Sequence, residues 1–185
     1  MTALALVAAY PNDVTTLVAH EPPLISVLPD AEAAERARAG VRDAYEASGS
    51  NAGLAAFIAM TSWRGEVHRR LLRPARARSC PVRHADRRRR IPGRPLLSDR
   101  SWAVSSYRPR VDALTAAPTR IVIAVGEGSL GTFTGRTAVA TAERLGQQAT
   151  VFPSHHGGFL GGEFRYAGQP EAFARRLHDV LDNAN

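Results

Sequence analysis

Two adjacent histidines, His155 and His156, are the residues of this sequence whose type and placement best fit a chemical role. They lie in residues 154–159, which read SHHGGF and follow directly after a short apolar run. An imidazole can bind a metal ion or carry a proton near neutral pH. Adjacent residues rarely point at one ion and no acidic cluster accompanies this pair, so we predict no metal site here. Two interpretations of the histidine pair stay open: a role in proton transfer, and a polar loop without a chemical role.

The surrounding residues predict a βαβ unit that would hold the histidines at the edge of a sheet. Residues 121–125 form a continuous run rich in β-branched side chains, typical of a strand covered on both faces. A glycine-rich loop follows, then apolar residues at helical spacing up to Gly146, and a second strand at residues 150–152. The imidazoles should therefore lie at the carboxyl edge of the sheet, where open α/β sheets place their ligands.

The remaining segments supply further elements of an α/β fold. Residues 14–20 predict a buried strand that ends at Glu21, because two prolines follow and cannot continue the ladder. Asp30 is the expected N-cap of the first long helix after that strand. Helices are predicted at residues 1–10, 31–47, 52–61, 101–106, 111–116 and 170–181.

The positive charge of the chain is concentrated in one segment. All 24 basic residues are arginines, and residues 64–100 hold 13 of them against three acids. From about residue 68 to 94 hydrophobic periodicity is absent, so we predict a disordered or loosely attached segment. This segment contains no aromatic residues that could stack on bases. We expect non-specific polyanion binding and no specific recognition of nucleic acid.

The cysteine content and the hydropathy of the sequence indicate the cellular compartment of the protein. The single cysteine, Cys80, excludes an internal disulfide and fits a reducing cytoplasm. No stretch approaches the length of a membrane span. The apolar start lacks the basic region and cleavage site of a secretory signal. We therefore predict a cytoplasmic protein with no membrane partner.

A glycine motif follows the first strand of the βαβ unit. Residues 126–131, GEGSLG, match the G-x-G-x-x-G pattern that cradles a pyrophosphate at a helix N-terminus. We expect the next helix to start near Arg136, away from the third glycine, and no acid follows the second strand to hold a ribose. A plain turn without a cofactor is the favoured interpretation. A nucleotide- or polyanion-binding α/β module stays as the alternative function.

Four segments, in this order and spacing, resemble the C-terminal half of a bacterial α/β-hydrolase: VTTLVAHEPPL, ALTAAPTRIVIAVGEGS, RTAVATAERLG and VFPSHHGGFLGG. The resemblance covers residues 1–62 and 95–185. It implies a partial α/β-hydrolase fold, with three parallel strands flanked by helices and a helical cap insertion. Residues 1–23 would form the core helix and strand, residues 24–117 the cap, and residues 118–185 the βαβ unit, the histidine loop and the C-terminal helix.

The resemblance also implies a catalytic apparatus. In this family a serine in a G-x-S-x-G turn attacks an ester or related carbonyl compound, a histidine takes its proton, and a carboxylate orients the histidine. His156 matches the catalytic histidine, with His155 as its possible substitute. The usual position of the carboxylate falls on Ser129, which cannot serve. Glu127 is one candidate for it, and Glu21, where some members keep their acid, is the other unless it only caps the proline turn.

The sequence contains no G-x-S-x-G turn before residues 1–10, where the resemblance would place it. The resemblance thus implies a chain that starts after the nucleophile and is inactive, or nearly so, by itself. It also leaves the strand at residues 14–20 as an uncovered edge, which favours self-association. Residues 68–94 replace a cap loop that is rich in Asp and Pro in related sequences, and a run of GAC codons read out of phase becomes arginine. A frame-shifted passage is our hypothesis for this segment.

Overall fold

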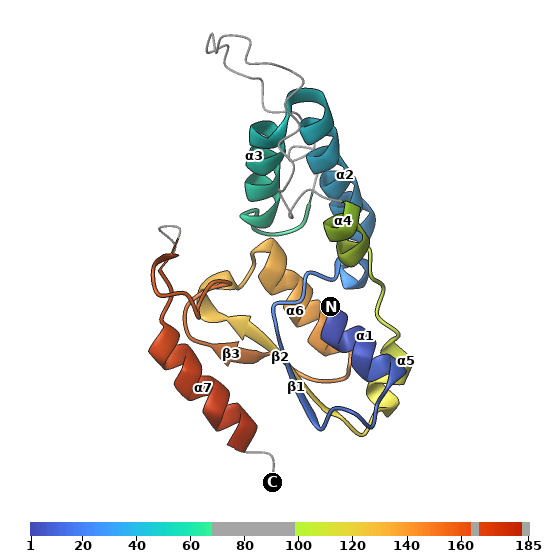
Figure 1. Ribbon diagram of the computed structural model, residues 1–185, viewed down its shortest axis with the longest axis vertical. Coiled ribbons are helices and arrows are strands. Elements are labelled where there is room, and N and C mark those ends of the chain that lie inside the picture. The colour runs from blue at the N-terminus through green and yellow to red at the C-terminus, as the bar shows by residue number, and fades with distance from the viewer. Residues whose placement is uncertain (68–98, 164–166, 183–185) are drawn as a thin grey trace.

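The computed structural model describes residues 1–67, 99–163 and 167–182, which form an α/β fold (Figure 1). Its three-stranded sheet has the order β1-β2-β3, and both pairings are parallel. The strands are β1 (Thr16–His20), β2 (Arg120–Gly126) and β3 (Thr150–Phe152). The register sets His20 opposite Ala124, and Ala124 opposite Thr150. The predicted α/β class and its three parallel strands are confirmed.

The central strand β2 is covered on both faces, as its apolar run predicts. Because side chains alternate along a strand, Val122 and Ala124 face one side while Ile123 and Val125 face the other. The first side packs with Phe152 and with α7 (Pro170–Asp182), and the second packs on α6 (Phe133–Arg144). The sheet therefore lies between these two helices (Figure 1).

Helix α6 begins at Phe133, three residues before the position expected from the sequence. Thr132 is its N-cap, since its hydroxyl accepts a hydrogen bond from the backbone N–H of Gly135 (3.3 Å). Gly131 supplies the turn into this cap with a φ of +81°. The prediction of a start near Arg136 was wrong because it overlooked this capping threonine.

A helical layer, defined here as α2 (Ala31–Ser48), α3 (Ser50–Thr61) and α4 (Asp99–Ser105), lies beyond one end of the sheet (Figure 1). Helices α2 and α3 meet at Gly49, whose φ of +82° reverses the chain. The guanidinium of Arg38 lies 3.9 Å from the ring centroid of Trp102, and this contact joins α4 to α2. The described residues between β1 and β2 are thus mainly helical, as predicted.

Asp30 stands at the start of α2 as predicted, but its side chain makes no capping bond there. Its carboxylate instead accepts hydrogen bonds from Arg136 of α6 and from the backbone N–H of Val67. Arg136 also donates to the carbonyl oxygen of Gly65 (2.8 Å). These bonds tie the helical layer to α6.

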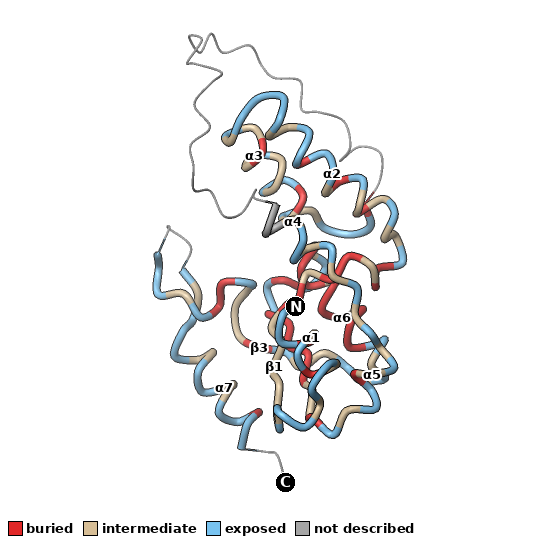
Figure 2. The backbone as a smooth tube through the Cα atoms, turned by 45° about the vertical axis from the view of Figure 1, so that its right-hand side comes forward, coloured by how far each residue is buried: buried red, intermediate tan, exposed pale blue. Residues whose placement is uncertain are grey.

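The main core lies where α1 (Thr2–Ala9), α6 and the segment after β1 meet. Helix α5 (Val111–Ala116) contributes Leu114 to this core. Figure 2 shows buried chain concentrated around α6 and the strands, and much exposed chain on α2 and α7. No helix in the described ranges is long and apolar enough to cross a membrane. The basic segment at residues 68–94 and the frame-shift hypothesis attached to it lie outside the described residues.

Candidate functional site

Glu21 follows β1 directly and is held in an unusual backbone conformation. Its φ is +44°, in the left-handed region that residues other than glycine rarely adopt. Its backbone N–H still donates to Ala124 (2.9 Å), so the residue ends the sheet pairing. The side chain is buried, with a relative exposure of 1%. Strain of this kind persists where the surrounding structure over-determines it, and it clusters at functional sites.

The carboxylate of Glu21 accepts hydrogen bonds from three directions. The backbone N–H of Gly126 donates to Oε1 (2.9 Å), while the hydroxyl of Thr134 (2.6 Å) and Nδ1 of His156 (2.9 Å) bond to Oε2. Burial alone would raise the pKa of Glu21. The bonds from His156, Thr134 and Gly126, with one from Ser129, outweigh burial and lower this pKa from 4.5 to about 2. Glu21 is therefore ionised at neutral pH.

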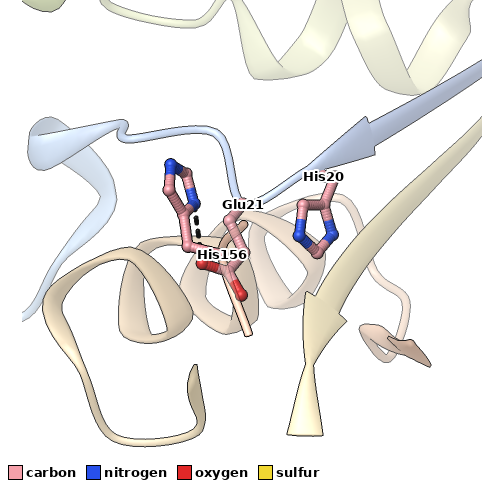
Figure 3. Close-up of side chains that lie close together, drawn as sticks. All are labelled: His20, Glu21 and His156. Carbon is pink, nitrogen blue, oxygen red and sulfur yellow. Dashed lines mark hydrogen bonds and ion pairs between the residues drawn. The ribbon is translucent and has the colours of Figure 1, made fainter. Parts of the chain in front are cut away.

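His156 lies on the loop after β3, opposite Glu21. Since an ionised carboxylate can only accept hydrogen bonds, Nδ1 of His156 carries the proton. Figure 3 shows the other ring nitrogen, Nε2, pointing away from Glu21. The His156 side chain is 53% exposed. An imidazole with its Nδ1 proton fixed by a carboxylate and its Nε2 lone pair accessible is arranged to accept a proton.

Close backbone packing positions the histidine loop. Ser154 has a φ of +69°, a second left-handed residue that is not glycine. A Cβ at Gly126 would lie 2.8 Å from the carbonyl oxygen of Ser154, and the N–H of Gly128 donates to that same oxygen (2.8 Å). The first two glycines of the G-x-G-x-x-G motif therefore let the end of β2 approach the histidine loop.

The structure separates the two histidines and the two candidate acids. His155 bonds through Nε2 to the carbonyl oxygen of Ala167 (3.0 Å), and its Nδ1 accepts from the N–H of Gly157 (3.1 Å), so its ring holds the loop. Glu127 accepts a hydrogen bond from the backbone N–H of Ser154 (3.2 Å). Glu21 is thus the acid on the ring of His156, and Glu127 contacts only loop backbone in the bonds described.

His20, the last residue of β1, is a member of this site that the sequence reasoning missed. Its ring stacks on His156, with 6.2 Å between centroids and 18° between planes, and meets Phe173 edge-on at 5.0 Å. Both ring nitrogens are buried and make no hydrogen bond of ordinary geometry in the described part of the chain, although the backbone of His155 and His156 lies near enough to act on the ring. Burial lowers the pKa of His20 and favours its neutral form. The signal was a polar residue beside Glu21 in a strand that otherwise reads as buried.

A cavity of about 730 Å³ opens beside His156 and reaches to the helical layer. Its volume is in the range of small-molecule sites. Apolar side chains dominate the lining, among them Ile25, Phe57, Met60, Trp102 and Phe133. Ser129 and Thr134 also line it. Within residues 1–67, 99–163 and 167–182, no hydroxyl hydrogen-bonds to Nε2 of His156.

Comparison with known proteins found no matching family model, no matching curated protein and no matching solved structure. The resemblance to α/β-hydrolases thus stays a prediction from four sequence segments. The geometry of His156 and Glu21 beside an apolar cavity is therefore the evidence for a function of this chain.

Proposed function

We propose that this chain belongs to a hydrolase of the α/β-hydrolase type, in which His156 is the general base and Glu21 is the carboxylate that orients it. The observation that carries the proposal is the 2.9 Å bond between Nδ1 of His156 and Oε2 of Glu21, which joins side chains 135 residues apart. The two residues follow β1 and β3, on either side of the central strand. The left-handed backbone of Glu21 and Ser154 supports the proposal, since neither conformation is needed to form the sheet.

In this reaction Nε2 of His156 takes the proton of a hydroxyl that attacks the carbonyl carbon of an ester. The ring becomes an imidazolium, and the ionised Glu21 beside it stabilises that charge. Thr134 and the N–H of Gly126 keep the carboxylate in place during the transfer. The imidazolium then returns the proton to the leaving alcohol, and a second cycle with water releases the acid.

The cavity indicates the class of substrate. A space of about 730 Å³ with a mainly apolar lining accepts a small molecule with an apolar acyl or alcohol group, and Arg38, Arg42 and Arg64 add positive charge to the lining. No hydroxyl of the described residues hydrogen-bonds to Nε2 of His156, so we propose that the attacking hydroxyl is supplied from outside the described residues or by another chain. The hydroxyl of Thr134 is already engaged by Glu21. The full sequence contains no G-x-S-x-G turn, so we expect the chain by itself to be inactive, or nearly so.

An activated ester and a serine-directed probe test this function. With p-nitrophenyl butyrate and a fluorophosphonate, the chain alone should show neither a burst nor labelling. A longer product that adds an in-frame G-x-S-x-G from the DNA before codon 1 should show both. In that product His156→Gln should lower kcat by about 10²- to 10⁴-fold, while His178→Gln, on the exposed side of α7, should not. Absence of G-x-S-x-G from this DNA, or an unchanged kcat in His156→Gln, would contradict the proposal.

The alternative function, a nucleotide- or polyanion-binding module, has less support. Gly126 and Gly128 serve the packing of the histidine loop, which explains the glycine motif without a phosphate. Helix α6 does start only two residues after Gly131, closer to the dinucleotide pattern than expected. Saturable binding of a nucleotide to the chain would favour this alternative. The arginine-rich segment lies outside the described residues.

We propose a second copy of the chain as a partner along β1. In the described part of the chain β1 pairs only with β2. Thr15 and Glu21 bond to β2, so by alternation the backbone groups of Thr16, Val18 and His20 point away from it. Sedimentation velocity should show a dimer or larger species. Thr16→Pro removes the backbone N–H that points away from β2 and spares the hydrogen bonds to β2. This variant should shift the protein toward monomer. A monodisperse wild-type monomer would contradict this partner.

A further inference from the structure

We propose that His20, Glu21 and His156 form a binding site for a divalent cation of the zinc class. One potential ligand atom from each residue lies within 4.8 Å of the other two. Figure 3 shows the carboxylate of Glu21 between the two imidazole rings. Two histidines and a glutamate, with one position left open, form a donor set that catalytic zinc sites use. This inference is independent of the proposed hydrolase function, but an ion on Nδ1 would leave Nε2 protonated, so His156 could not act as the general base while the ion is bound.

His20 gives the first argument for a cation. Both of its ring nitrogens are shielded from solvent, and neither makes a hydrogen bond of ordinary geometry to a described residue. The backbone of His155 and His156 lies near enough to raise the pKa of His20, which accounts for a ring N–H but leaves the lone pair of the other nitrogen without a donor. Folded proteins rarely leave a buried polar atom unsatisfied, and an unoccupied ion site is one recognised cause. Phe152 and Phe173 hold the ring from its other sides, with centroids at 6.0 Å and 5.0 Å. A cation bound by one nitrogen would satisfy a lone pair that the protein itself does not.

The spacing of Glu21 and His156 gives the second argument. Two ligand atoms at about 2.1 Å from one ion lie roughly 3.0–3.4 Å apart. Nδ1 of His156 and Oε2 of Glu21 are 2.9 Å apart, so a small opening of this pair admits the ion. The cation takes the place of the Nδ1 proton, which leaves to solvent, and the carboxylate stays ionised. His20 completes the site by a shift of its ring toward the carboxylate.

The surroundings of Glu21 fit a ligand of this kind. Thr134 and the N–H of Gly126 hydrogen-bond to the carboxylate and would go on orienting it after an ion binds. His156 borders the cavity, so the open position of the ion would face a space large enough for water or an anion. The sequence alone suggests only the adjacent pair His155 and His156 as metal ligands, and we predict no metal site at that pair. The fold instead brings His20 and Glu21 to His156.

Titration of the EDTA-stripped full chain with ZnCl2 tests this site. We expect saturable binding of one ion at the cluster, and X-ray absorption of the Co²⁺-loaded protein should show only nitrogen and oxygen ligands, with two imidazoles. His20→Phe keeps an aromatic ring against Phe173 and removes the nitrogens, so affinity should fall more than about tenfold. His178→Gln, which is exposed on α7, is the matched control and should bind like wild type.

Three results would overturn the proposal: no saturable binding, an unchanged affinity in His20→Phe, or sulfur in the ligand shell, because the only cysteine, Cys80, is not in the cluster. If His20→Phe does not fold, the ligands that X-ray absorption identifies in the Co²⁺-loaded wild-type protein test the site by themselves. The ester and probe assays are run in EDTA. Failure of the metal site therefore leaves the hydrolase proposal standing, and the reverse also holds.

Discussion

Replacing Glu21 with glutamine should lower the free energy of unfolding at pH 7 by about 3 kcal/mol. The pKa of Glu21 falls from 4.5 to about 2 on folding, and each pKa unit corresponds to about 1.4 kcal/mol of differential stability. Glutamine has nearly the same shape but no charge, and its amide group meets donors where the carboxylate only accepted. Urea denaturation of both proteins in EDTA measures the difference without a bound cation.

The same carboxylate should make the wild-type protein sensitive to acid. Because its pKa is depressed in the folded state, the stabilisation is present above the unfolded value of 4.5 and is lost as pH falls toward about 2. From roughly pH 5 to pH 2, the free energy of unfolding should therefore drop by about 3 kcal/mol more in wild type than in Glu21→Gln. Other carboxylates titrate in both proteins, so the difference isolates Glu21.

Glu127→Gln is the matched control for this prediction. Glu127 is exposed and its described bond goes to the backbone N–H of Ser154. Its replacement should change stability by less than about 1 kcal/mol at pH 7 and leave the acid transition as in wild type. If the two variants behave alike, the buried network around Glu21 is not the source of the effect. The comparison also separates the two candidate acids by experiment.

Local sequence patterns predicted most elements of this fold. The apolar run of β2 and the helix α5 were found because each depends on neighbouring residues, and α5 has the bounds that were expected. The predicted start of α6 was wrong because the spacing of apolar residues does not show the N-cap, Thr132, which is defined by its side-chain bond to Gly135. Patterns of this kind describe short-range preferences, so they succeed where local propensity and packing agree.

The site was only partly predictable, for a physical reason. The resemblance matched His156, with His155 as its substitute, and left Glu21 and Glu127 as candidates for the acid. The choice between the two acids depends on how β1 pairs with β2 and on which carboxylate reaches the ring of His156. That ring is 135 residues from Glu21 in the sequence. His20 carried only a weak signal, a polar residue in an otherwise apolar strand, because strand alternation does not reveal which ring a side chain will contact. The α/β-hydrolase resemblance named a role for these residues and stays a prediction.

Gly135→Ala should destabilise the protein by at least about 3 kcal/mol, the upper end of the usual range for overpacking. A Cβ at this position would lie 2.0 Å from the carbonyl oxygen of Ser129 and 2.7 Å from its carbon, both backbone atoms. Ser129 cannot retreat easily, since its carbonyl oxygen accepts bonds from the N–H (2.9 Å) and the hydroxyl (2.7 Å) of Thr132. Relief requires α6 to move, and Thr134 would then leave Glu21.

Gly40→Ala is the control, because Gly40 also lies inside a helix but a Cβ there meets nothing within 4 Å. Alanine is favoured over glycine in a helix, so this variant should gain about 0.5–1 kcal/mol. The two substitutions are chemically identical and should change the urea midpoint in opposite directions. The ¹⁵N shifts of the His156 ring should also change in Gly135→Ala alone, since only there is the Glu21 network disturbed. A midpoint for Gly135→Ala close to that of wild type would show that α6 and Ser129 are not packed as described.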